Sequence, residues 1–233
     1  FLAVLVALVL IHTDELHVQA GQAREERRRQ NTWQSLREGL AYVWTTPSVA
    51  LVIFVVGVVL LLGANFNVVL PLFATDVLHE GATRFGFLSG AMGTGALLAA
   101  LWLAWRQVKP TVPAVLIATL LFSLLEVAFA LSSVYLASLA LIAGVGASES
   151  IFGALAVTIM QMEAPDHLRG RVNSVYIFFF SGSVPVGYVM AGWLSALIGA
   201  PLGLLLCAVL CLATVGVGWI WWVRSRQKAP GHQ

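Results

Sequence analysis

Charged side chains are scarce in this sequence: Asp, Glu, Lys and Arg make up 10% of its 233 residues, against a hydrophobic fraction of 59%. Soluble domains carry about 25% charged residues, so these proportions exclude an ordinary soluble globular chain. The sequence also has no P-loop, no G-x-S-x-G nucleophile motif and no metal-ligand pair. We therefore expect neither an enzyme nor a protein that holds a cofactor or a metal.

Cysteine is nearly absent as well, with Cys207 and Cys211 as the whole complement. A spacing of four residues places both on one face of a helix, and further metal ligands do not lie nearby in sequence. The two cysteines are interpreted as small apolar packing residues.

Long apolar stretches dominate what remains. They cover residues 1–11, 49–75, 85–105, 111–131, 134–162, 172–198 and 202–223. A run of about 20 apolar residues crosses the roughly 30 Å of bilayer hydrocarbon as a helix. The sequence predicts an all-α integral membrane protein with six complete spans, and the short stretch 1–11 is interpreted as the end of a truncated transmembrane helix.

Positive charge is almost missing from alternate gaps between these stretches. Of the 13 Lys and Arg residues, Arg84 alone falls in the gaps at 76–84, 132–133 and 199–201. Basic loops face the cytoplasm, so segment 12–47 and the tail 224–233 are predicted to be cytoplasmic. The basic residues are scattered over membrane-flanking loops and form no patch, which argues against nucleic-acid binding.

Segment 12–47 precedes the expected six-helix transmembrane domain, residues 48–223. It begins polar, and over about 33–44 its apolar residues recur at helical spacing, among them Leu36, Leu40 and Val43. This pattern predicts a short amphipathic helix at the membrane surface. Docking of a cytoplasmic partner is the alternative interpretation.

Small residues are frequent in several spans, where they let helix backbones approach closely in lipid. Gly86, Gly90 and Gly93 recur in the second span, and Gly182 precedes Pro185 in the fifth. We assign these residues to helix packing, with Pro185 as a candidate kink. Static packing and helices that rock or slide past one another both fit the pattern.

Glu149 is the charged residue that lies deepest in the predicted membrane. It falls about 15 residues into the span that begins near Val134, or roughly 22 Å along a helix axis. A carboxylate near mid-bilayer is costly and should face protein or a water-filled cavity. A proton-coupling or cation-binding role and a structural carboxyl hydrogen-bonded to a neighbouring helix are both consistent with this position.

Other polar side chains lie in the outer halves of the spans. Asn65 and Asn67 precede Pro71 in the first full span, and an Asn in hydrocarbon requires a hydrogen-bond partner. They are candidates to line a substrate path, with interhelical bonding or support of the backbone near a break at Pro71 as alternatives. Glu126 lies on a mild polar stripe of the third span, and a functional role is less expected there.

One loop carries a recognisable motif. Residues 164–172, A-P-D-H-L-R-G-R-V, resemble the loop between the tenth and eleventh helices of major facilitator superfamily transporters. The closest branch is that of enterobactin exporters and macrolide-efflux proteins. Residues 65–73 and 85–96 look like that branch's seventh and eighth helices, and 36–43 resembles its entry into the second half.

The resemblance implies that the chain is the C-terminal six-helix half of a twelve-helix transporter whose N-terminal six-helix half is missing. Such a half contributes one wall of a substrate cavity near the midplane. The implied cavity-facing helices favour roles for Glu149, Asn65 and Asn67 and disfavour one for Glu126. Asp166, Arg169 and Arg171 are the expected gating residues of the cytoplasmic loop.

The expected function is proton-coupled efflux of a drug-like or siderophore-like small molecule by alternating access, in a bacterial plasma (inner) membrane. The expected partners are that substrate, protons, the lipid bilayer and the missing half. A rival of a different class is a six-span membrane sensor or scaffold that uses the amphipathic segment to dock a cytoplasmic protein.

Overall fold

The computed structural model describes residues 37–78, 81–106, 108–166 and 168–227. The expected helix remnant at 1–11 and most of segment 12–47 lie outside these ranges. Residues 37–45 are helical and lead directly into the first span; we call them the surface helix.

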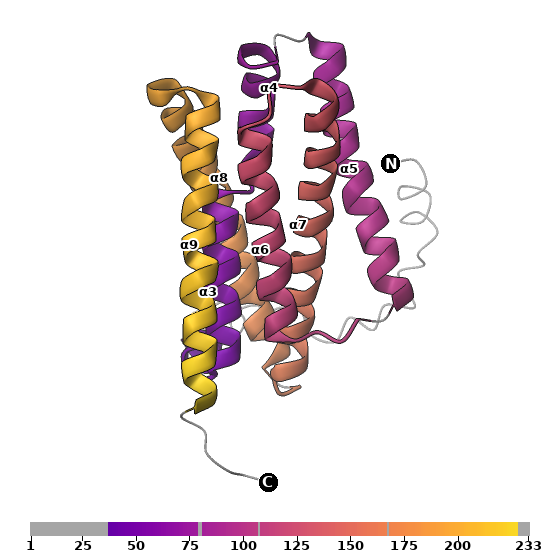
Figure 1. Cartoon of the computed structure of the whole chain (residues 1–233). Coiled ribbons are helices and arrows are strands. Elements are labelled where there is room, and N and C mark those ends of the chain that lie inside the picture. The colour runs from indigo at the N-terminus through magenta and orange to yellow at the C-terminus, as the bar shows by residue number, and fades with distance from the viewer. Residues whose placement is uncertain (1–36, 79–80, 107, 167, 228–233) are drawn as a thin grey trace, which may run out of the picture.

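The described part of the chain contains helices and no strands, and six of its stretches are long and apolar enough to cross a membrane. The predicted all-α six-span bundle is thereby confirmed (Figure 1). Its helices are α3 (Pro47–Leu62), α4 (Phe66–Asp76), α5 (Ala82–Arg106), α6 (Val112–Ala130), α7 (Tyr135–Glu163), α8 (Arg169–Ile198) and α9 (Ala200–Gln227).

The first span is interrupted, so that α3 and α4 occupy its two halves (Figure 1). The break covers residues 63–65, whereas Pro71, near which a break was expected, lies inside α4. Backbone carbonyls released at membrane depth need donors. The amide of Asn65 supplies them, because its Nδ2 donates to the carbonyls of Leu61 at 2.9 Å and Leu62 at 3.0 Å.

A chain of buried phenylalanines joins α4, α6 and α7. The rings of Phe73 and Phe129 lie 4.6 Å apart, and Phe66 contacts both Phe129 and Phe122 at 6.2 and 6.3 Å. Phe122 in turn meets Phe152 of α7 edge-on at 5.4 Å. Aromatic pairs in these geometries stabilise packing beyond the area they bury, so this cluster fixes α4 relative to α6.

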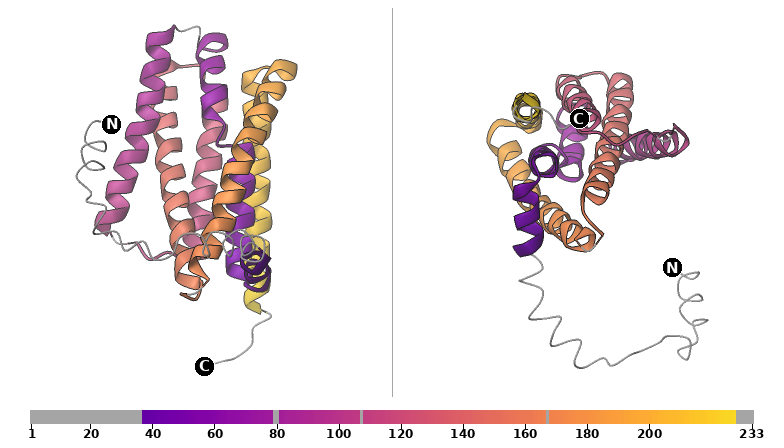
Figure 2. Two further views of the ribbon diagram at one scale, coloured as in Figure 1. Left: turned by 180° about the vertical axis from the view of Figure 1, so that it is seen from behind. Right: turned by 90° about the horizontal axis from the view of Figure 1, so that it is seen from below.

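Helices α5 and α7 approach each other through two glycines. A Cβ at Gly95 would lie 1.9 Å from the carbonyl oxygen of Ala143, and one at Gly146 would lie 2.2 Å from that of Met92. The two backbones are therefore in direct contact. Figure 2 shows α5 at the edge of the bundle, where it contacts α7 and α4 among the described helices.

The glycines assigned to packing from the sequence are in different surroundings. A Cβ at Gly86, Gly90, Gly93 or Gly182 would meet nothing within 4 Å. These four positions therefore make no close contact between the described helices, and Gly93 instead borders a pocket. Pro185 lies inside the continuous helix α8.

The α5–α7 contact gives a stability prediction. We expect Gly95→Ala to destabilise the protein by about 1–3 kcal/mol, because the new methyl group overlaps a backbone carbonyl that cannot rotate away. The measurement is thermal unfolding of the purified chain in detergent. Gly90→Ala, on the same helix with open space in front of it, is the matched control; equal melting temperatures for the two variants would contradict the packing described here.

Candidate functional site

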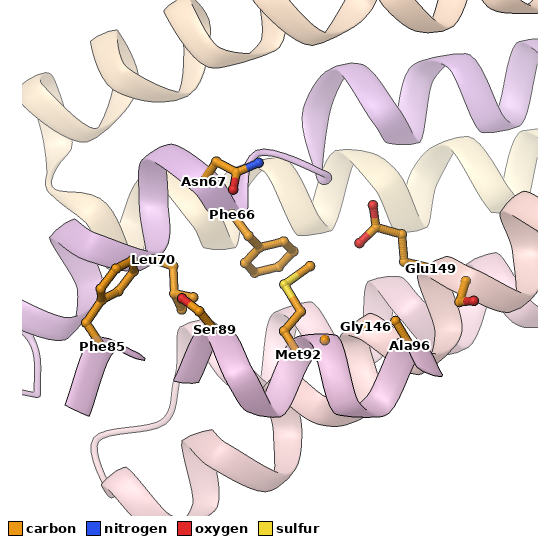
Figure 3. A pocket seen from close by; sticks show the side chains of 11 residues that line it. Phe66, Asn67, Leu70, Phe85, Ser89, Met92, Ala96, Gly146 and Glu149 are labelled. Atoms are coloured by element: carbon orange, nitrogen blue, oxygen red, sulfur yellow. The ribbon is translucent and has the colours of Figure 1, made fainter. Parts of the chain in front are cut away.

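A pocket of about 480 Å³ lies between α4, α5 and α7 (Figure 3). It is lined by Phe66, Asn67, Leu70, Phe85, Ser89, Met92, Gly93, Ala96, Gly146, Glu149 and Ser150. Most of this lining is apolar or aromatic, with a few polar groups, as in typical small-molecule sites.

Glu149 is the one acidic group in this lining, and its carboxyl points into the pocket (Figure 3). It occupies the midpoint of the 29-residue helix α7, and its depth in the bilayer stays a prediction. Within the described ranges, its carboxyl has no hydrogen bond and no ion pair.

The α5–α7 contact explains the surroundings of Glu149. Gly146 lies one turn before it and holds the backbone of α5 at Met92. This places Met92, Gly93 and Ala96 around the carboxyl. On the other side, a Cβ at Gly153 would meet nothing within 4 Å, so the helix leaves space beside its acidic residue.

The two asparagines that the sequence grouped together have different positions. Asn67 is exposed, lines the pocket and donates from Nδ2 to the hydroxyl oxygen of Tyr188 on α8 at 2.7 Å. Asn65 is buried, lies outside the pocket lining and bonds to the carbonyls at the end of α3. Asn67 thus contributes to the pocket, and Asn65 supports the break.

Glu126 is a buried acid for which the sequence made a functional role less expected than for Glu149. Its side chain is fully buried on α6, and its carboxyl packs against Gly63 in the break of the first span. The stripe of Thr119, Ser123 and Glu126 was the available signal. The two hydroxyl groups of this stripe donate to backbone carbonyls one turn earlier, which leaves the acid as its unpartnered member.

The expected gating residues form two separate ion pairs. Arg169 pairs with Asp166 of its own loop at 3.0 Å, with both side chains largely exposed. Arg171 pairs instead with Glu38 of the surface helix. The structure therefore brings Arg171 together with a residue far away in sequence and leaves Asp166 and Arg169 as a local pair.

Two hydrogen bonds to Glu163 hold the surface helix and α3 against the C-terminal end of α7. The hydroxyl of Tyr42 donates to the carbonyl of Glu163 at 2.6 Å, and Ser48 donates to its carboxylate at 2.9 Å. We call these two bonds, together with the Arg171–Glu38 pair, the loop clamp. Its partner residues were invisible to sequence patterning, since each bond spans more than 100 residues.

The described ranges contain no group of three or more His, Cys, Asp or Glu residues placed to hold a metal ion. Cys207 and Cys211 are buried free thiols on α9.

Residues 1–230 match the family model described as Transmembrane secretion effector. Searches of curated proteins and of solved structures found no match. The family match covers nearly the whole chain and agrees with the six helices that are long and apolar enough to span a membrane. The chain belongs to the Transmembrane secretion effector family of the major facilitator superfamily.

Proposed function

We propose that this protein exports a drug-like or siderophore-like small molecule across the membrane, driven by antiport of protons. Membership of a transporter family with a role in efflux supplies the class of activity. The observation that carries the coupling is the position of Glu149, a carboxyl at the midpoint of a spanning helix that points into a pocket and has no partner in the described ranges.

The coupling follows from the chemistry of one carboxyl in apolar surroundings. Such a group must bind a proton, bind a cationic ligand or contact water. A proton on Glu149 removes the charge that would hold a cationic part of a substrate, so the two ligands exclude each other. Proton binding from outside then favours substrate release there, and proton loss to the cytoplasm restores the carboxylate for the next substrate.

The remaining lining supports an amphipathic substrate. Phe66, Phe85 and Met92 offer aromatic and polarizable surface, which adapts to varied apolar ligands. Asn67 and Ser89 offer hydrogen-bonding groups at the same pocket. This mixture suits a molecule with an extended apolar body and a small number of polar groups.

We further propose that the chain forms the C-terminal half of a twelve-helix transporter of the enterobactin-exporter and macrolide-efflux branch. The motif at 164–172 supports the branch, and paired halves build midplane sites in such transporters. Exposed apolar residues such as Phe87 on α5 and Phe178 on α8 leave surface for lipid and for the second half. Gly86, Gly90, Gly93 and Gly182 have room in front of them for that half.

The proposed location is the inner membrane of a bacterium with the C-terminus in the cytoplasm. Arg106, Arg171 and Arg224 lie near helix ends on one side of the bundle, Lys109 lies in the connection between α5 and α6 on that side, and Arg84 lies near the start of α5 on the other side (Figure 1). This distribution supports a cytoplasmic position for the basic side. The loop clamp lies on that side, where it would stabilise one of the two conformations of alternating access.

The Glu149→Gln variant tests the coupling. We expect proton-driven efflux to fall to background, because Gln keeps the shape and the hydrogen-bonding capacity but cannot exchange a proton. The measurement is substrate transport by the complete transporter in proteoliposomes with an imposed pH gradient. Asp76→Asn, which removes a carboxylate at the end of α4, is the control and should transport normally. Wild-type efflux by Glu149→Gln would refute the proposed role.

The loop clamp gives a second functional prediction. Arg171 and Glu38 are both partly exposed, and such a pair contributes about 1 kcal/mol at most, or about fivefold in a conformational equilibrium. We expect Arg171→Glu to change the transport rate by up to that factor, and the swap Arg171→Glu with Glu38→Arg to restore it. Arg169→Glu, which disturbs only the local pair with Asp166, is the comparison. A swap that transports no better than the single variant would show that the pair does not act in gating.

A further inference from the structure

Glu126 is a titratable group that the proposed cycle does not use, and its surroundings are unusual for an acid. Its side chain is 0% exposed, and neither carboxyl oxygen has a hydrogen-bond partner in the described ranges. Buried charges in proteins are normally paired or hydrogen-bonded. The Glu126 carboxyl has neither a charged partner nor a hydrogen bond among the described residues. This indicates that it is protonated and therefore neutral.

The helices packed against α6 contain few groups that could compensate a charge there. Helix α7 contributes Glu149, which is of like sign, and α9 contributes the thiols of Cys207 and Cys211. Helix α3 contains no titratable residue. Helices α3, α4 and α7 contain no Lys, Arg or His, Asp76 is the last residue of α4, and Arg224 and Arg226 lie in the last turn of α9. A bare Glu126 carboxylate would therefore have no counter-charge beside it among these described helices.

The carboxyl of Glu126 also lies against the break between α3 and α4. Its Oε2 is 2.9 Å from the position that a Cβ on Gly63 would take, so it packs directly on the backbone of the break. Three residues further on, α4 begins at Phe66 without a side-chain cap on its first turn. The N-terminus of a helix presents free N–H groups and favours negative charge.

We infer that Glu126 is a second proton-binding site, inside the six-helix bundle, whose occupancy controls the joint between α3 and α4. With the proton bound, the acid packs as a neutral group against Gly63. When the proton leaves, the new carboxylate attracts the uncapped first turn of α4. Since Phe66, Asn67 and Leu70 of α4 form one wall of the pocket, this movement changes the pocket itself.

The charge state of Glu126 affects the pocket through Glu149, which lines it. Glu126 and Glu149 lie on α6 and α7, which pack against each other, and like charges that interact in apolar surroundings give up their protons one at a time. Glu149 faces the pocket, whereas Glu126 has no exposed surface. The control of α4 rests on the proton-driven transport proposed above; the presence of a proton on Glu126 does not.

Infrared difference spectroscopy tests the bound proton directly. The complete transporter in lipid nanodiscs is titrated with acid and base, and the carbonyl stretch of protonated carboxyl groups is followed. We expect Glu126→Gln to lose one band that the Glu149→Gln variant retains, while Asp76→Asn leaves both intact. An unchanged set of bands in Glu126→Gln would overturn the inference.

A second variant, which keeps Glu126, tests the inference in case Glu126→Gln does not fold. In Gly63→Ala the new Cβ would press on the carboxyl of Glu126, so we expect the frequency of its band to shift while the Glu149 band stays in place. Gly57→Ala, on α3, the helix just before the break, and with nothing within 4 Å of its Cβ, is the control. A Gly63→Ala spectrum identical to that of Gly57→Ala would also overturn the inference.

The two proposals fail in distinguishable ways. Wild-type efflux by Glu149→Gln together with a Glu126 band would refute proton coupling through Glu149 and leave the buried proton established. Abolished efflux in Glu149→Gln without a Glu126 band would refute this inference and leave the coupling intact.

Discussion

A helix that is interrupted inside a bilayer must find new partners for its backbone, and this requirement governs the architecture of the protein. The amide of Asn65 satisfies the carbonyls of Leu61 and Leu62, so α3 can end at membrane depth without exposing them to hydrocarbon. Helix α4 can then take a path of its own and pack its phenylalanines on α6. The pocket exists because α4, displaced in this way, forms a wall opposite α5 and α7.

The break between α3 and α4 lies beside Glu126 and positions α4 next to the pocket that contains Glu149. Gly63, which lacks a side chain, makes room for the carboxyl of Glu126, and the displaced α4 borders the space in front of Glu149. One irregularity in an otherwise regular bundle therefore borders both the pocket and the fully buried carboxyl of Glu126. In transporters, interrupted membrane helices commonly border the substrate site.

Sequence patterning predicted the six spans and the place of Glu149 near the middle of its helix, because span length and the distance along a helix depend on residue number alone. It misplaced the break, since Pro71 was the visible signal and the Asn65 amide bonds depend on three-dimensional folding. It also favoured Gly86, Gly90 and Gly93 over Gly95 and Gly146. Spans that are apolar on every side carry no periodic signal for the face that meets a neighbour, so neither the packing glycines nor the interior position of Glu126 could be derived.

The reciprocal contact between α5 and α7 has a consequence for movement. Gly95 of α5 accommodates the carbonyl of Ala143, and Gly146 of α7 accommodates that of Met92, so the two members on each helix are three positions apart in sequence. Translation of one helix by a single residue, about 1.5 Å, would bring a side chain onto a carbonyl at both points. The pair is therefore locked in register and must move as one rigid body. The freedom to change the shape of the pocket is left to α4, which is joined to α3 through three residues of non-helical backbone.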